Sequence, residues 1–145
     1  YTVVFQMQGM LALLAGKGGD AAAAVHHASL AREALAQGGA GSFFPHLGFV
    51  GIFETLFAQL RREPKHAKHL LNDHKQAFKT LRSQQRTRPY VRPLYYLYQA
   101  EVKLLTAKAS AAKRLLTRGL SHAEGLKGPW EIQLLERALK KLDKK

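Results

Sequence analysis

Seven stretches of helical length, separated by glycines and prolines, are the feature that most limits how this chain folds. No stretch alternates apolar and polar residues for long enough to make a strand. Leucine (23 residues) and alanine (21 residues) dominate the composition, and both lose little side-chain entropy in a helix. The sequence therefore predicts an all-α fold with helices near residues 2–15, 20–37, 43–62, 65–84, 92–106, 109–126 and 129–143.

Capping signals agree with these divisions. Asp20 is placed to cap the second helix, and Ser110 stands where the sixth begins. Pro64 and Pro129 fall in first helical turns, where the missing N–H of proline costs nothing.

A faint internal repeat relates these helices. A small residue is followed twelve positions later by a small or medium residue, and then by others four and three positions further on. Such spacing lets two antiparallel helices approach closely. The unit recurs about every 44 residues: Ala12, Ala24, Ala28 and Ala31; Ala58, Leu70, His74 and Ala77; Ala100, Ala112, Leu116 and Gly119.

This spacing resembles the helix-pair pattern of tetratricopeptide repeats. The likeness is best over Tyr98–Leu142, which contains Leu104-Leu105, Ala123-Glu124 and Pro129-Trp130-Glu131. The stretch is similar to degenerate repeats that follow the ATPase regions of soluble-type adenylate or guanylate cyclases and of large signalling ATPases. The resemblance implies a right-handed α-solenoid, in a single domain (1–145) of repeats 1–38, 43–84 and 91–126 plus a final helix, 129–143. It also implies a protein–protein interaction scaffold.

The chain opens on Tyr1 without an initiator Met, so we expect it to be the terminal portion of a larger protein, by resemblance a nucleotide cyclase or a signalling ATPase. A second possibility is that the segment regulates such an enzyme within the same chain.

Positive charge is concentrated in the second part of the sequence. The net charge of the chain is +13, yet residues 1–60 carry −1 and residues 61–145 carry +14. Such asymmetry predicts an acidic partner. The densest stretch holds ten cations, which we expect to form the partner-binding face: Arg61, Arg62, Lys65, Lys68, Lys75, Lys79, Arg82, Arg86, Arg88 and Arg92.

Two kinds of partner fit this basic stretch. Arginines interleaved with Tyr90, and followed by Tyr95, Tyr96 and Tyr98, suit a phosphate backbone with stacked bases. The same residues suit a Glu-rich protein segment, through charge-assisted hydrogen bonds. We favour an acidic protein surface or tail within a larger complex, and nucleic acid is the alternative.

No residue constellation predicts catalysis. The chain has no cysteine, and its acidic residues are scattered, so we predict that this segment is not an enzyme. The Gly16–Gly19 turn lacks the Ser or Thr of a phosphate-binding loop, and no cofactor is expected. His66, His69 and Asp73 share a helix face with two lysines that oppose a cation, so no metal is expected either. No apolar run reaches the roughly 20 residues of a transmembrane helix, and we expect a cytoplasmic location, with association with the cytoskeleton or a cilium as a further option.

Several aromatic residues are expected to form core. Phe49, Phe53 and Phe57 share one face of an unusually apolar helix, which also begins with Phe43 and Phe44 and offers an alternative subunit contact. Tyr95, Tyr98, Val102 and Leu105 form a second stripe at helical spacing. Trp130 is expected to pack the final helix onto the preceding pair, and an exposed residue for partner contact is the alternative. Of the adjacent His26 and His27, one is expected to pack and the other to be exposed.

Overall fold

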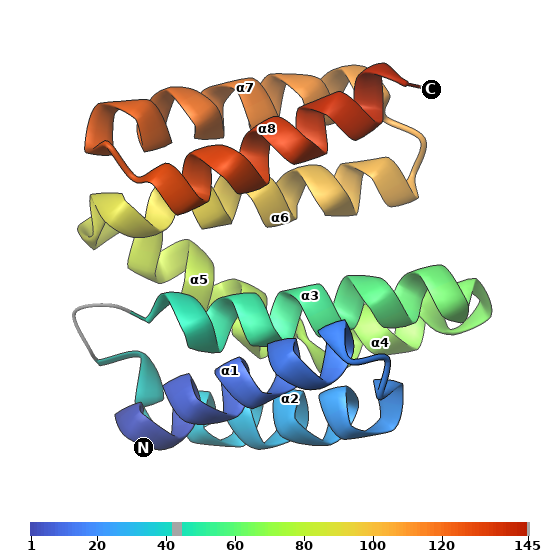
Figure 1. Ribbon diagram of the computed structural model, residues 1–145, viewed down its shortest axis with the longest axis vertical. Helices are drawn as coiled ribbons and strands as arrows, with labels where there is room; N and C mark the ends of the chain where they lie inside the picture. The colour runs from blue at the N-terminus through green and yellow to red at the C-terminus, as the bar shows by residue number, and fades with distance from the viewer. Residues whose placement is uncertain (42–44, 145) are drawn as a thin grey trace. The chain divides into compact units, whose positions relative to one another are not determined.

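The computed structural model describes residues 1–41 and 45–144, and every regular element in these ranges is helical (Figure 1). The chain forms two compact units, residues 1–81 and 82–145. In chain order the elements are α1 (Thr2–Lys17), α2 (Ala21–Ala36), η1 (Gly39–Gly41), α3 (His46–Arg62), η2 (Pro64–His66), α4 (Ala67–Asp73), α5 (Lys75–Thr87), η3 (Pro89–Val91), α6 (Arg92–Leu105), α7 (Ala109–Leu126) and α8 (Pro129–Asp143).

The all-α prediction is confirmed, and consecutive helices pack in antiparallel pairs. Asp20 caps α2 as predicted, because its Oδ1 accepts a hydrogen bond of 3.0 Å from the Ala23 N–H. Ser110 is not a cap: α7 begins at Ala109, with Lys108 at the N-cap position. The expected helix start at Phe43 and Phe44 lies outside the described residues.

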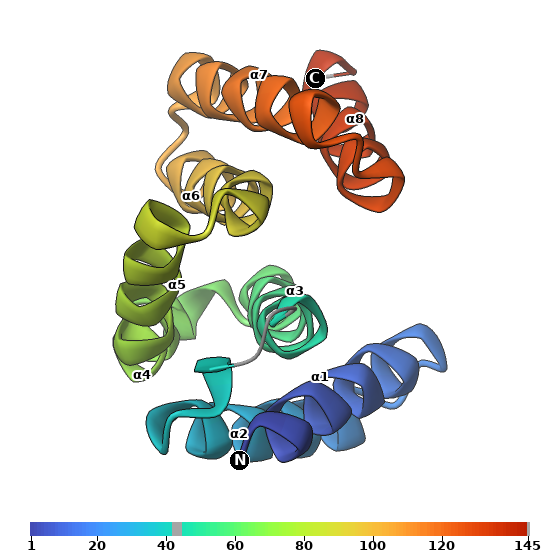
Figure 2. The same ribbon diagram turned by 90° about the vertical axis from the view of Figure 1, so that its left-hand side faces the viewer.

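In the first unit, α1 and α2 form an antiparallel pair and α3 lies against α1 (Figures 1 and 2). The four residues whose spacing predicted close approach are all buried: Ala12, Ala24, Ala28 and Ala31. His27 packs toward α1, with its Nδ1 2.7 Å from Oε1 of Gln8, whereas His26 is exposed, as predicted.

The crossing of α1 and α3 is a contact between backbones. A Cβ added at Gly51 would fall on the backbone of Gly9, and one added at Gly9 would fall on Leu47 and Gly48. The ring of Phe5 occupies the space that a Cβ of Gly48 would need. The helices can therefore touch only because these positions have no side chain.

This crossing also provides a hydrogen-bond acceptor for a backbone N–H group at the start of α3. Pro45, at the N-cap position, gives no side-chain cap, and instead Oε1 of Gln6 on α1 accepts a 2.8 Å hydrogen bond from the Gly48 N–H. One of the unpaired N–H groups of a helix start is thus satisfied from a neighbouring helix.

The predicted phenylalanine core of α3 is confirmed. Phe49, Phe53 and Phe57 are all buried. Phe49 meets Phe5 edge-on at a centroid distance of 5.3 Å, and Phe53 lies 4.6 Å from Phe78 of α5. Apart from Leu47 of α3, the exposed large apolar side chains of the described part of this unit lie on or beside α1, where Val3, Met7, Met10 and Leu14 follow one another at helical spacing.

The prediction of one continuous helix over 65–84 is wrong, because the structure divides this segment into η2, α4 and α5. The second break is at His74, whose backbone N–H is shared between Leu70 and Leu71 carbonyls and whose ring Nδ1 lies 2.7 Å from Leu70 O. A side chain that bonds to its own preceding turn competes with the helical pattern. His74 and Ala77 are buried, but Ala58 and Leu70 are only half-buried, so this repeat packs less closely than the others.

In the second unit, α6 and α7 form a pair and α8 packs on α7 (Figures 1 and 2). Its predicted close-approach residues are buried: Ala100, Ala112, Leu116 and Gly119. A Cβ at Gly119 would lie 3.0 Å from both Leu135 Cδ2 and Tyr96 Cβ, so the three helices meet at this glycine.

Two aromatic predictions for this unit are corrected. Trp130 does not anchor α8, because it is 38% exposed; Leu135 is the buried residue of that helix. Pro129 places Trp130 in the first turn, before α8 reaches the contact at Gly119. In the tyrosine stripe only Tyr98 is fully buried, and Leu105 is exposed because α6 ends there. No helix in the described part of the chain has the length and apolarity needed to cross a membrane.

We predict that Gly51→Ala lowers the free energy of unfolding by about 3 kcal/mol or more, because the new methyl group meets backbone that cannot rotate away. Gly16→Ala is the matched control in α1, where nothing lies within 4 Å of the added Cβ. That change should raise stability by up to about 1 kcal/mol. Urea unfolding followed by circular dichroism measures both, and equal effects would contradict the glycine crossing.

We also predict that Ala112→Trp disrupts the second unit, whereas Lys113→Glu does not. Ala112 is fully buried between helices, and overpacking there costs about 1–3 kcal/mol or more. Lys113 is exposed and its Nζ lies 3.2 Å from Oδ1 of Asp143, an ion pair worth about 0–1 kcal/mol. Thermal midpoints of the two variants provide the test, and similar shifts would show that the repeat spacing is misplaced.

Candidate functional site

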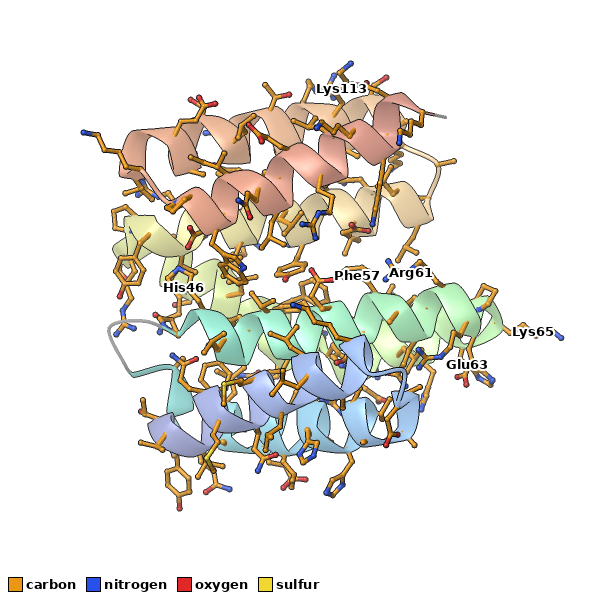
Figure 3. The ribbon with its side chains drawn as sticks, in the orientation of Figure 1. His46, Phe57, Arg61, Glu63, Lys65 and Lys113 are labelled. Carbon is orange, nitrogen blue, oxygen red and sulfur yellow. The ribbon has the colours of Figure 1, made fainter. Side chains whose placement is uncertain are left out.

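The ten predicted cations lie on several elements. Six belong to the first unit: Arg61 and Arg62 in α3, Lys65 in η2, Lys68 in α4, and Lys75 and Lys79 in α5. Arg82, Arg86, Arg88 and Arg92 belong to the second. The first eight are exposed, and Figure 3 shows Lys65 extending outward beyond the end of α3. Arg88 and Arg92 are half-buried.

Helix α5 brings four of these residues together. Lys75, Lys79, Arg82 and Arg86 are spaced four, three and four residues apart, so they lie on one face of the helix. We call them the cationic stripe of α5. The opposite face is buried through Ala77 and Leu81. The burial of that face is what fixes the stripe toward solvent.

The cationic stripe has no acidic residue to neutralise it on its own helix. The sequence of α5, KQAFKTLRSQQRT, contains no Asp or Glu. Asp73, the last residue of α4, instead lies 3.4 Å from His69, and Glu63 is ten or more positions before the stripe. Four like charges on one exposed face attract an anionic partner and raise its association rate.

A second basic group lies in the second unit, and of its basic members the sequence predicted only Arg92 as part of a binding face. His122 of α7 stacks on Tyr96 of α6, with ring centroids 5.4 Å apart and planes within 9°. The Arg118 guanidinium carbon lies 5.2 Å from the centroid of the same tyrosine. Arg92 lies four residues before Tyr96, on the same face of α6, and together these residues form what we call the Arg–His cluster. Arg118 and His122 are one helical turn apart, but nothing in the sequence marks Tyr96, 22 positions earlier, as their neighbour.

The electrostatics of the cluster favour an anion. Partial desolvation of His122, followed by the positive charges of Arg92 and Arg118, lowers its pKa below the ordinary value of 6.5. The charges that act on this imidazole are therefore both positive. Arg92 is oriented by its Nε, which donates a 3.1 Å hydrogen bond to the Gln85 carbonyl.

The histidines weighed as metal ligands are not brought together. His66 lies in η2, and only His69 and Asp73 are in contact. Within the described ranges, 1–41 and 45–144, no group of three His, Asp or Glu side chains is placed to hold a metal ion. Of the Gly16–Gly19 segment, Gly16 and Lys17 end α1, and Gly18 and Gly19 make the turn to α2, where Gly19 has a φ of 82° that favours glycine.

His74 is the most strongly perturbed histidine, and its role is structural. Burial, followed by the nearby Arg32 charge, lowers its pKa from 6.5 to about 4. Arg32 is held close because its Nη1 donates a 2.9 Å hydrogen bond to the Asp73 carbonyl. A carbonyl can only accept, so the Nδ1 that meets Leu70 O carries the proton of a neutral ring.

We predict that stability falls with acidification because His74 is held neutral in the folded state. The unfolded chain takes up a proton below about pH 6.5, whereas the folded chain resists it down to about pH 4. This contribution is complete above pH 6.5 and decreases as the pH falls toward 4. Between pH 7.5 and pH 5 the loss is about 2 kcal/mol.

Urea unfolding at a series of pH values measures this loss. His74→Asn keeps an N–H donor for Leu70 but cannot titrate, so its stability should vary less over this pH range. His26→Asn, at an exposed histidine, is the control and should behave as the wild type does. An unchanged pH profile in His74→Asn would contradict the assignment.

Comparison with known proteins gives no match to this chain among family models, curated proteins or solved structures.

Proposed function

We propose that this chain is a protein–protein interaction module and that the cationic stripe of α5 docks an acidic segment of its partner. The observation that carries the proposal is the arrangement of α5, with four exposed cations on one face and buried apolar residues on the other. A helix presented in this way offers charge at regular spacing without having to fold on binding, which avoids an ordering cost.

We also propose that the helix pairs are degenerate tetratricopeptide-like repeats within a larger protein, such as a nucleotide cyclase or a signalling ATPase. The burial of Ala12, Ala24, Ala28 and Ala31, and of the corresponding residues from Ala100 to Gly119, supports the repeat assignment. In a variant of this proposal, the partner is another domain of the same larger protein, and the module regulates that protein from within the same chain.

An acidic protein segment is favoured over nucleic acid by the surroundings of the stripe. Among the tyrosines suited to stacking on bases, Tyr96 and Tyr98 are buried, and Tyr90 and Tyr95 are half-buried. Tyr96 is in addition engaged by His122 and Arg118. Binding to single strands relies on accessible aromatic rings next to the cations. The exposed part of α5 offers charge alone.

We predict that reversing the stripe, by Lys75→Glu, Lys79→Glu, Arg82→Glu and Arg86→Glu together, weakens binding of a Glu-rich peptide at least about tenfold. Each exposed pair is worth about 0–1 kcal/mol, and four act together. Helicity should be retained, since all four side chains are exposed. Fluorescence anisotropy with a labelled twelve-residue polyglutamate peptide measures the affinity, and circular dichroism measures helicity.

The control reverses the same amount of charge elsewhere, at Lys140, Lys141, Lys144 and Lys145, of which Lys145 lies outside the described residues. It should weaken peptide binding much less. Equal losses in both variants would reject the stripe as the docking face. Tighter binding of a single-stranded RNA than of the peptide, with a steep dependence on salt, would favour nucleic acid as the partner.

A further inference from the structure

The Arg–His cluster of the second unit gathers donors for a small anion. Arg92 comes from the first turn of α6, and Arg118 and His122 come from consecutive turns of α7. Tyr96 is the platform between them: its ring is parallel to that of His122 and also lies under the Arg118 guanidinium. The tyrosine itself is buried, whereas Arg118 is exposed and His122 half-buried.

The packing of α7 on α6 explains why these residues meet. Gly119 lets α7 approach until a Cβ there would be 3.0 Å from Cβ of Tyr96 and 3.5 Å from the Pro93 carbonyl. Arg118 directly precedes this contact, and His122 follows it by three residues, which keeps both near Tyr96. The position of the cluster is therefore set by a rigid helix contact, as a preformed binding site requires.

The cluster has an excess of positive charge that nothing in it balances. Arg118 lies over the ring of Tyr96, and Arg92 donates a hydrogen bond to the carbonyl of Gln85. Neither of these partners is a carboxylate. The two charges acting on His122, from Arg92 on α6 and Arg118 on α7, repel its protonated form. An anion placed among the three would remove this repulsion and gain charge-assisted hydrogen bonds.

The number and shape of the donors favour a phosphoryl group. Two guanidinium groups and an imidazole are three separate donors, and a phosphate monoester presents three acceptor oxygens with a charge of about −1.5 to −2 near pH 7. A carboxylate has two oxygens and a single charge. The guanidinium fork is also well matched to phosphate oxygens.

We propose that Arg92, Arg118 and His122, arranged around Tyr96, form a binding site for a phosphoryl group. The group comes either from free phosphate or from a phosphorylated side chain of a partner. The site shares no residue with the cationic stripe of α5, and the proposal goes beyond the docking function because it specifies a ligand chemistry rather than general acidity.

Nuclear magnetic resonance of the whole chain tests the site through the ring protons of His122. Inorganic phosphate, titrated at constant ionic strength, should shift these signals in a saturable way, which chloride should not do. N-acetyl-phosphoserine amide and N-acetyl-glutamate amide are the two other probes. Tighter binding of the phosphoserine compound than of inorganic phosphate identifies a phosphorylated side chain as the source, and the reverse order identifies free phosphate.

Variants assign the binding to the cluster. Arg118→Gln removes an exposed guanidinium and should weaken phosphate binding about tenfold or more, and Arg92→Gln should have a similar effect. Arg137→Gln, at an exposed arginine of α8, is the matched control and should retain binding within about twofold. Because Arg118 is exposed, its variant is expected to fold even if the loss of Arg92 disturbs the start of α6.

Three results would overturn the proposal. The His122 signals would respond to chloride as they do to phosphate, or the shift would not saturate, or the Arg118 and Arg137 variants would bind phosphate equally. The stripe reversal on α5 separates the two proposals, because it should weaken polyglutamate binding at least about tenfold and leave the phosphate response of His122 in place.

Discussion

Contact between helix backbones, permitted by side chains no larger than a methyl group, is the constraint on which the rest of this structure depends. Gly9 and Gly51 let α1 and α3 touch, and Gly119 does the same for α7 and its neighbours. Close approach in the pairs α1–α2 and α6–α7 is permitted by four buried alanines, Ala12, Ala24, Ala100 and Ala112. Because these contacts are rigid, they decide where the larger side chains lie, including the phenylalanines of α3 and the tyrosine beneath Arg118.

Much of the fold could be predicted, because its determinants are local or periodic. Glycine and proline divide the helices, Asp20 caps one of them, and the twelve-residue step identifies the positions that become buried in the first and third repeats. The break at His74 could not be predicted this way, since no Gly or Pro marks it and its cause is a ring bonded to the preceding turn. The prediction that Trp130 packs α8 onto the preceding pair failed for a similar reason. Which residue of α8 is buried depends on the tertiary contact between α8 and α7, and in the structure Leu135 is the residue that meets Gly119.

The candidate site likewise has some features that the sequence predicts and others that depend on tertiary structure. The cations of α5 could be predicted to share a face, because helical spacing alone determines it. Their exposure follows from the burial of Ala77 and Leu81, which is a tertiary property. The Arg–His cluster depends wholly on tertiary structure: Arg92 and His122 are 30 positions apart, and only the approach of α7 to α6 places them together. No local pattern carries that information.

The like charges of α5 also have an energetic effect on the helix that bears them. Cations three or four positions apart on one helix repel, by about 0.2–0.5 kcal/mol for each pair. Lys75 with Lys79, Lys79 with Arg82, and Arg82 with Arg86 are three such pairs. Dissolved salt screens this repulsion and so favours the helix, while the same ions compete with any acidic ligand for the stripe. The ionic strength of the medium therefore acts in opposite directions on the two properties of α5, strengthening it as a helix and weakening it as a binding surface.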